Sequence, residues 1–192
     1  HKHRRRQRQM CIRDRSNTRA NGEINPQYTD TFVFTNDFAA LQSNTPTLKI
    51  QEGLLHAELE KGICKVICFS PDHSKTLANM EVSEIVNVVK LWLEEFTTLQ
   101  ANPTINYIQI FENKGAVMGC SNPHPHGQIW AQSSLPNEIV KKDNQQKKYF
   151  NENKRTLLGD YLEQELKEKE RVLFENEYFV VLVPFWAVWP FE

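Results

Sequence analysis

One long amphipathic segment, set among shorter strand-like runs, most constrains how this chain can fold. Between about Asn79 and Gln100, apolar residues recur every three or four positions, and Pro103 follows the end of the pattern. The apolar positions of this helix face are Ile85, Val88, Val89, Trp92, Phe96 and Leu99. Helical and strand-like segments do not alternate regularly along the chain. This favours an α+β domain over a doubly wound parallel sheet.

The strand-like runs predict several antiparallel strands with the helix across one face. They are rich in β-branched and aromatic residues and cover residues 31–35, 64–69, 105–111, 129–131 and 179–183. Residues 137–170 are charged and helix-favouring, so we expect one or two solvated surface helices there. Cys64 and Cys68 share one face of their strand because side chains alternate. Buried apolar packing is favoured for them over metal binding.

Composition indicates a globular protein and excludes several other classes of protein. The 192 residues are 40% hydrophobic and 10% aromatic, which suits a substantial core and is unlike a disordered chain. No apolar stretch reaches the ~20 residues of a membrane-spanning helix, so no membrane partner is expected. The basic amino-terminal segment lacks the apolar run of a secretory signal. The cysteines lack the spacing of a disulfide framework, so we expect a cytoplasmic location.

The net charge of −1 hides a basic amino-terminal segment. Residues 1–15 hold seven of the 23 basic residues and one of the 24 acidic ones. Such a segment can bind nucleic acid through the phosphates. However, residues 10–15 resemble the translation of a sequencing-adapter tail, and ordinary sequence starts at Ser16. We therefore interpret residues 1–15 as a non-native or disordered tail and residues 16–192 as one domain, and we expect no nucleic-acid partner.

The histidine- and proline-containing run at residues 119–128 carries the most chemical information. Its two prolines hold the backbone extended, so His124, His126 and Gln128 point to one side. Small residues nearby let a phosphate approach backbone N–H groups. A neutral imidazole, with its pKa near ~6.5, is a good nucleophile toward phosphorus. Two histidines at this spacing are also typical of a metal site, so the spacing alone leaves both roles open.

Several segments, taken in their order along the chain, resemble galactose-1-phosphate uridylyltransferases, a branch of the histidine-triad superfamily. The main segment runs from Phe111 to Trp130 and includes the histidine run. The other segments are Phe34–Phe38, Cys68–Leu77 and Pro184–Glu192. The resemblance implies the amino-terminal portion of such an enzyme. This would be a HIT-like half of a two-repeat transferase, with an antiparallel sheet and flanking helices, truncated at both ends.

The resemblance further implies a ping-pong reaction of the Leloir pathway of galactose metabolism. UDP-glucose would uridylylate His126 and release glucose 1-phosphate, and galactose 1-phosphate would then take the UMP to give UDP-galactose. Gln128 stands where histidine-triad hydrolases carry a histidine. A glutamine amide can hydrogen-bond phosphoryl oxygens but cannot serve as acid or base for water. The full-length protein is expected to be a homodimer, and this chain is expected to turn over poorly or not at all.

Nucleotide contacts implied by the resemblance fall on Asn36, Asp37, Asn113, Gly119, Ser121 and Gln128. Asn36, Asp37 and Asn113 would by themselves be read as turn residues. The alternative enzyme is another histidine-triad nucleotidyltransferase or a dinucleoside polyphosphate phosphorylase. The non-enzymatic alternative is a nucleic-acid binder, and it depends only on residues 1–15.

The resemblance also implies a structural zinc held by His73, His124 and a pair of cysteines. Cys11 matches the first cysteine, but Asp14 occupies the place of the second. Because structural zinc has four ligands, we expect zinc occupancy to be weak or absent. A second metal site of the family is not assigned, since Lys142 stands where a glutamate is expected.

Overall fold

The computed structural model describes residues 18–118 and 124–189. It divides into two compact units, of which one ends at Leu135 and the other begins at Pro136. One domain was expected for residues 16–192, whereas the structure has two compact units. The histidine pair lies in the first unit.

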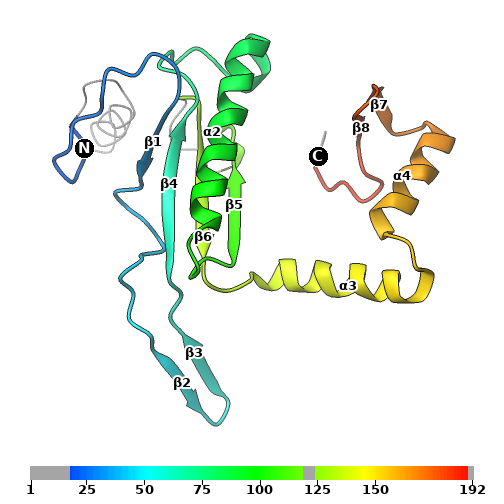
Figure 1. Ribbon diagram of the computed structural model, residues 1–192, viewed down its shortest axis with the longest axis horizontal. Helices are drawn as coiled ribbons and strands as arrows, with labels where there is room; N and C mark the ends of the chain where they lie inside the picture. Colours follow the sequence, from blue (N-terminus) through cyan, green and yellow to red (C-terminus); the bar gives the residue numbers. More distant parts are fainter. Residues whose placement is uncertain (1–17, 119–123, 190–192) are drawn as a thin grey trace. The chain divides into compact units, whose positions relative to one another are not determined.

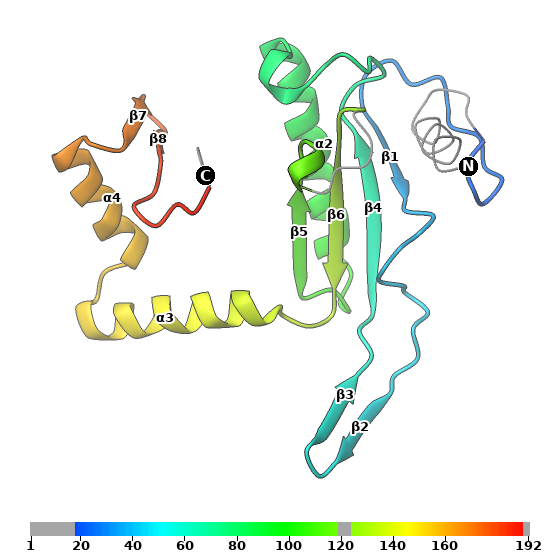
Figure 2. The same cartoon turned by 180° about the vertical axis from the view of Figure 1, so that it is seen from behind.

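The first unit is built on a four-stranded sheet in the order β1-β4-β6-β5, which Figure 2 shows from the open side. The strands are β1 (Phe32–Thr35), β4 (Gly62–Cys68), β5 (Tyr107–Phe111) and β6 (His126–Gln132). Each neighbouring pair is antiparallel. The expected α+β class is confirmed, as are the strand-like runs that became these four strands.

Helix α2 (Val82–Gln100) lies across one face of the sheet (Figure 1). Side chains from the helix, the sheet and the adjoining loop form the core, and apolar burial of this kind is the main stabilising contribution to the fold. The buried members of this core are Ile67, Phe69, Met80, Val88, Leu99, Ile129 and Ala131. The sheet face turned away from α2 carries the site residues of β6.

The prediction of which residues form the apolar face of this helix is partly wrong. Four of its six positions are buried or pack against the core, but Val89 and Phe96 are 49% and 41% exposed. Glu95 instead points inward and is 8% exposed. Its carboxylate lies 2.5 Å from the ammonium of Lys65 in β4. An ion pair between helix and sheet therefore occupies a place where an apolar contact was expected.

A hairpin of β2 (Lys49–Glu52) and β3 (Leu55–Glu58) projects from the end of the sheet (Figures 1 and 2). Every residue of both strands is exposed. The hairpin was not predicted, because its strands are short and poor in β-branched residues. Gly53, with a φ of +58°, makes the turn that joins them. Two single-turn 3-10 helices, η1 (Leu77–Asn79) and η2 (Ala116–Met118), complete the unit.

The second unit contains two helices and a small hairpin. These elements are α3 (Asn137–Asn153), α4 (Leu157–Glu168), β7 (Val172–Glu175) and β8 (Val180–Leu182). The expected surface helices are confirmed as two, and β8 lies within the run expected at 179–183, whereas β7 was not expected. The carboxylate of Glu165 is fully buried, and its two oxygens share the N–H of Arg171 Nε at 2.6 and 2.9 Å. Within the described residues, no helix has the length and apolar character needed to cross a bilayer.

Candidate functional site

Strand β6 divides its side chains between the two faces of the sheet. Ile129 and Ala131 lie in the core under α2. Because side chains alternate along a strand, His126 and Gln128 lie on the opposite face. His126 is 9% exposed and Gln128 is half-buried. The two residues proposed from sequence for the chemistry thus lie two positions apart on the sheet face turned away from α2.

Gly127 lies between these residues at a point of close packing. A Cβ there would be 2.8 Å from Cζ of Phe69 and 3.0 Å from the backbone oxygen of Phe111. Phe69 is 2% exposed, and its ring meets that of Trp92 edge-on with centroids 6.0 Å apart. The absence of a side chain at this position lets the Phe69 ring pack directly under the backbone of the site strand.

His126 is oriented by a backbone hydrogen bond. Its Nδ1 lies 2.7 Å from the carbonyl oxygen of His124. A carbonyl can only accept, so Nδ1 carries the hydrogen, and the lone pair of the neutral ring is on Nε2. The N–H of Phe69 donates to the carbonyl of Pro125 at 3.0 Å, which fastens the backbone between the two histidines to the residue that follows β4.

His124 is 1% exposed, and its ring meets side chains from two other segments. Its Nδ1 lies 3.0 Å from Nδ1 of His73, and the two rings meet edge-on with centroids 4.4 Å apart. Its Nε2 lies 3.4 Å from the hydroxyl of Tyr28. The fold therefore brings together the two histidines implied as metal ligands. Tyr28 was not a candidate, because no sequence pattern joins it to a histidine so far along the chain.

The residues around His124 can be compared with the requirements of zinc. His73 and His124 supply two ring nitrogens, whereas a structural zinc takes four nitrogen or sulfur ligands. Across residues 18–118 and 124–189, no group of three or more His, Cys, Asp or Glu could hold a metal ion. Cys11 lies outside the described residues. The described donors do not fit a structural zinc, so no catalytic step is assigned to a metal.

Asn36 and Asp37 follow β1 and are held by backbone contacts. Asn36 Oδ1 accepts a hydrogen bond from the N–H of Phe38 at 3.0 Å, as in a turn. Asp37 Oδ2 accepts from the N–H of Ala20 at 3.2 Å, and its Oδ1 lies 3.6 Å from the guanidinium of Arg19. The turn role that these residue types suggest is therefore present, and Asp37 also fastens the preceding segment.

The strand register places Asn36 away from His126. The N–H of Asn36 donates to the carbonyl of Cys64, whereas His126 is opposite Cys68. Four residues along β4 correspond to about 13 Å. Asn36 and Asp37 therefore lie further along the sheet and not beside His126.

The loop after β5 begins at the same end of the sheet as His126. Phe111, the last residue of β5, is opposite Gln128, and Asn113 follows two residues later and is exposed. Burial raises the pKa of Glu112, and the nearby charge of Lys114 opposes that shift. Glu112 was not predicted from sequence. The implied phosphate-binding residues Gly119 and Ser121 lie outside the described residues.

Two sequence models of one family match the chain. "Galactose-1-phosphate uridyl transferase, N-terminal domain" matches residues 2–136, and the corresponding C-terminal domain matches residues 141–192. The change from one match to the other falls close to the boundary between the two structural units.

Known relatives agree with these matches. Galactose-1-phosphate uridylyltransferase of Haemophilus influenzae is 49% identical over 183 residues, covering 95% of this chain and 52% of the relative. The enzyme of Rattus norvegicus is 48% identical over 176 residues, covering 91% of this chain and 46% of the relative. The chain thus spans about half the length of the curated relatives it matches.

A solved structure described as a uridylyltransferase aligns with a TM-score of 0.78. The alignment covers 86% of this chain and 53% of that chain, and at 23% identity it shows the fold alone. The first family model covers most of the chain, including β6 and its histidine. The chain therefore belongs to the galactose-1-phosphate uridylyltransferase family.

Proposed function

We propose that this chain carries the nucleophile and part of the nucleotide site of an enzyme that moves UMP from UDP-glucose to galactose 1-phosphate. The observation that carries the proposal is the bond from His126 Nδ1 to the His124 carbonyl. It fixes the ring in the tautomer whose Nε2 can attack phosphorus. Membership of the family supports the choice of substrates.

The reaction divides into two displacements at the α-phosphorus. In the first, the Nε2 lone pair of His126 forms an N–P bond, and the P–O bond to glucose 1-phosphate breaks, so that this leaving group takes the electron pair. In the second, a phosphate oxygen of galactose 1-phosphate attacks the uridylyl-histidine, and the N–P bond breaks to restore the imidazole. Neither displacement needs a protein acid, because the attacking and leaving phosphates are ionised.

Gln128 suits the role of a neutral hydrogen-bond donor to the phosphoryl oxygens. It follows His126 by two residues on the same sheet face. An amide can stabilise charge that develops on those oxygens but cannot activate water. We propose that this choice protects the covalent intermediate until the sugar phosphate arrives.

The remaining nucleotide contacts are proposed from the family resemblance. Asn36 and Asp37 would bind the nucleoside end, which their position further along the sheet supports. Asn113 would act near the phosphates, together with Gly119 and Ser121. We further propose a reducing, cytoplasmic location, which the buried free thiol of Cys64 supports, and a homodimer for the full-length protein.

Incubation with UDP-glucose labelled in the uridine tests the nucleophile. We expect the chain to retain covalent label and His126→Asn to lose at least about 100-fold in labelling rate. His56→Asn is the matched control, because His56 lies in the exposed hairpin. Equal labelling of the two variants would rule out His126. Turnover with galactose 1-phosphate, measured separately, tests the second displacement.

A further inference from the structure

The loop between β4 and α2, residues 70–79, carries His73 to the ring of His124. The loop starts beside the site, since Cys68, at the end of β4, is opposite His126. It ends at Met80, which is 8% exposed and part of the core. His73 lies in the exposed middle of the loop. Its position therefore depends on what holds that middle part.

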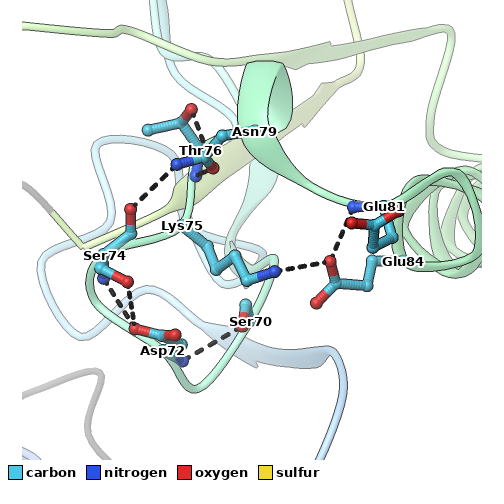
Figure 3. A network of polar contacts seen from close by, with 8 residues as sticks. All are labelled: Ser70, Asp72, Ser74, Lys75, Thr76, Asn79, Glu81 and Glu84. Atoms are coloured by element: carbon cyan, nitrogen blue, oxygen red, sulfur yellow. Dashed lines mark hydrogen bonds and ion pairs between the residues drawn. The ribbon is translucent and has the colours of Figure 1, made fainter.

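Two side-chain-capped turns fix the local shape of this loop, and Figure 3 shows both. In the first, Asp72 Oδ1 accepts from the N–H and the hydroxyl of Ser74, each at 2.8 Å. In the second, Asn79 Oδ1 accepts from the N–H of Thr76 at 2.5 Å, and its Nδ2 donates to the carbonyl of Ser74 at 3.3 Å. The first turn, from Asp72 to Ser74, contains His73, and the second, from Ser74 to Asn79, contains Lys75.

A contact between residues nine positions apart joins this loop to α2. Lys75 Nζ lies 2.9 Å from Glu84 Oε2 in the first turn of α2, and 27% and 33% of the two side-chain surfaces are exposed. The same carboxylate oxygen accepts from the N–H of Glu81 at 2.8 Å, as in a capping box (Figure 3). Because that bond holds Glu84 against the helix end, Lys75 is tied to a rigid element.

The connection continues from this loop to the nucleophile. Nδ1 of His73 is 3.0 Å from Nδ1 of His124, and the carbonyl of His124 accepts the bond from Nδ1 of His126 at 2.7 Å. A shift of the loop changes what the buried His124 ring contacts, and the backbone of His124 orients His126. Small displacements of a reacting group cost rate steeply.

We propose that the Lys75–Glu84 ion pair is a positioning device for the uridylyl-transfer site. It holds the loop against α2 so that His73 supports His124, and through it His126. The contacts that define the pair join Lys75, Glu84 and the N–H of Glu81 and do not include His126, so we expect their effect to fall on the rate of transfer and not on substrate binding. The inference rests on the proposed function, and the experiment separates the two.

The test compares Lys75→Met with Lys141→Met. Lys141 also forms an ion pair, with Glu138, but that pair is exposed and lies in α3. We expect Lys75→Met to lower the maximal rate of His126 labelling about tenfold. The UDP-glucose concentration at half-saturation should change by less than about twofold. Lys75→Arg, which keeps the charge and the donors, should stay within about threefold of the parent, and Lys141→Met should match the parent.

Proton–nitrogen correlation spectra of the imidazoles give a second measurement that needs no substrate. In Lys75→Met, the ring signals of His73 and His124 should move or broaden, while those of His56 in the exposed hairpin stay in place. Superimposable spectra, or labelling by Lys75→Met at the rate of Lys141→Met, would overturn the positioning role. Absence of labelling in the parent chain would count against the proposed function alone, and the spectra would still decide this inference.

Discussion

The ammonium of Lys65 in β4 lies 2.5 Å from the carboxylate of Glu95 in α2, at the contact between helix and sheet. Only 21% and 11% of the two side-chain surfaces are exposed. Lys65 is directly opposite Ile129 of β6, one of the fully buried core residues. The pair therefore fastens α2 to β4, the neighbour of the strand that carries His126. Either charge alone would be poorly solvated in these surroundings.

Removing one partner of this pair should lower the free energy of unfolding. Glu95→Ala leaves the Lys65 ammonium partly buried without its carboxylate, so we expect a loss of about 2 kcal/mol in the free energy of unfolding. Glu138→Ala breaks the exposed pair with Lys141 and should cost less than about 0.5 kcal/mol. Urea unfolding of both variants measures the difference. Similar midpoints for the two variants would contradict a stabilising role for the buried pair.

Gly127→Ala should strain the site strand. The added Cβ would meet the Phe69 ring at 2.8 Å and the Phe111 carbonyl at 3.0 Å, so we expect a destabilisation of about 1–3 kcal/mol. Phe69→Leu removes the ring atom that clashes. The double variant should then be less destabilised than the sum of the two single variants, as measured by denaturant unfolding. Strict additivity would show that the ring is not what excludes a side chain here.

The carboxylate of Glu60 accepts four hydrogen bonds from the segment that follows β6. The donors are the N–H and hydroxyl groups of Ser133 and Ser134, at 2.6 to 2.9 Å. Burial alone would raise the pKa of Glu60. However, these hydrogen bonds, led by the Ser134 hydroxyl, outweigh burial and hold the pKa below its usual 4.5.

This lowered pKa predicts a pH dependence of stability. A carboxyl whose pKa is lower in the folded state stabilises the fold above its unfolded pKa, and this contribution is lost as pH falls through the folded value. The advantage of the parent over Glu60→Gln should be constant above about pH 6 and shrink below about pH 4.5. Ser134→Ala should show a weaker dependence than the parent. Parallel curves of unfolding free energy against pH for parent and Glu60→Gln would contradict this account.

We expect the purified chain to hold less than stoichiometric zinc. His73 and His124 offer two nitrogen ligands, and the family resemblance implies a second cysteine at the position of Asp14. Incomplete ligand sets bind zinc weakly. Metal analysis after dialysis against zinc measures the occupancy, with His73→Asn as the comparison. Stoichiometric zinc in the parent, lost in His73→Asn, would show that further ligands complete the site.

The parts of the fold that depend on local periodicity can be predicted from the amino-acid sequence alone. Alternation and turn residues located β1, β4, β5 and β6, and the three- to four-residue period located α2. The prolines around His124 and His126 indicated an extended backbone. This is confirmed from His126 onward, where β6 begins, whereas residues 124–125 form a bend. These features follow from the backbone preferences of neighbouring residues, so they are visible without the rest of the molecule.

Which side chains these elements bring together depends on how the folded chain packs. Glu95 turned inward in place of Phe96 because Lys65, 30 residues away, offers a countercharge on the facing strand. Tyr28 and His73 met the ring of His124 because the sheet order places their segments beside the start of β6. Such contacts depend on the packing of distant segments, and local periodicity carries no information about which distant side chains will meet.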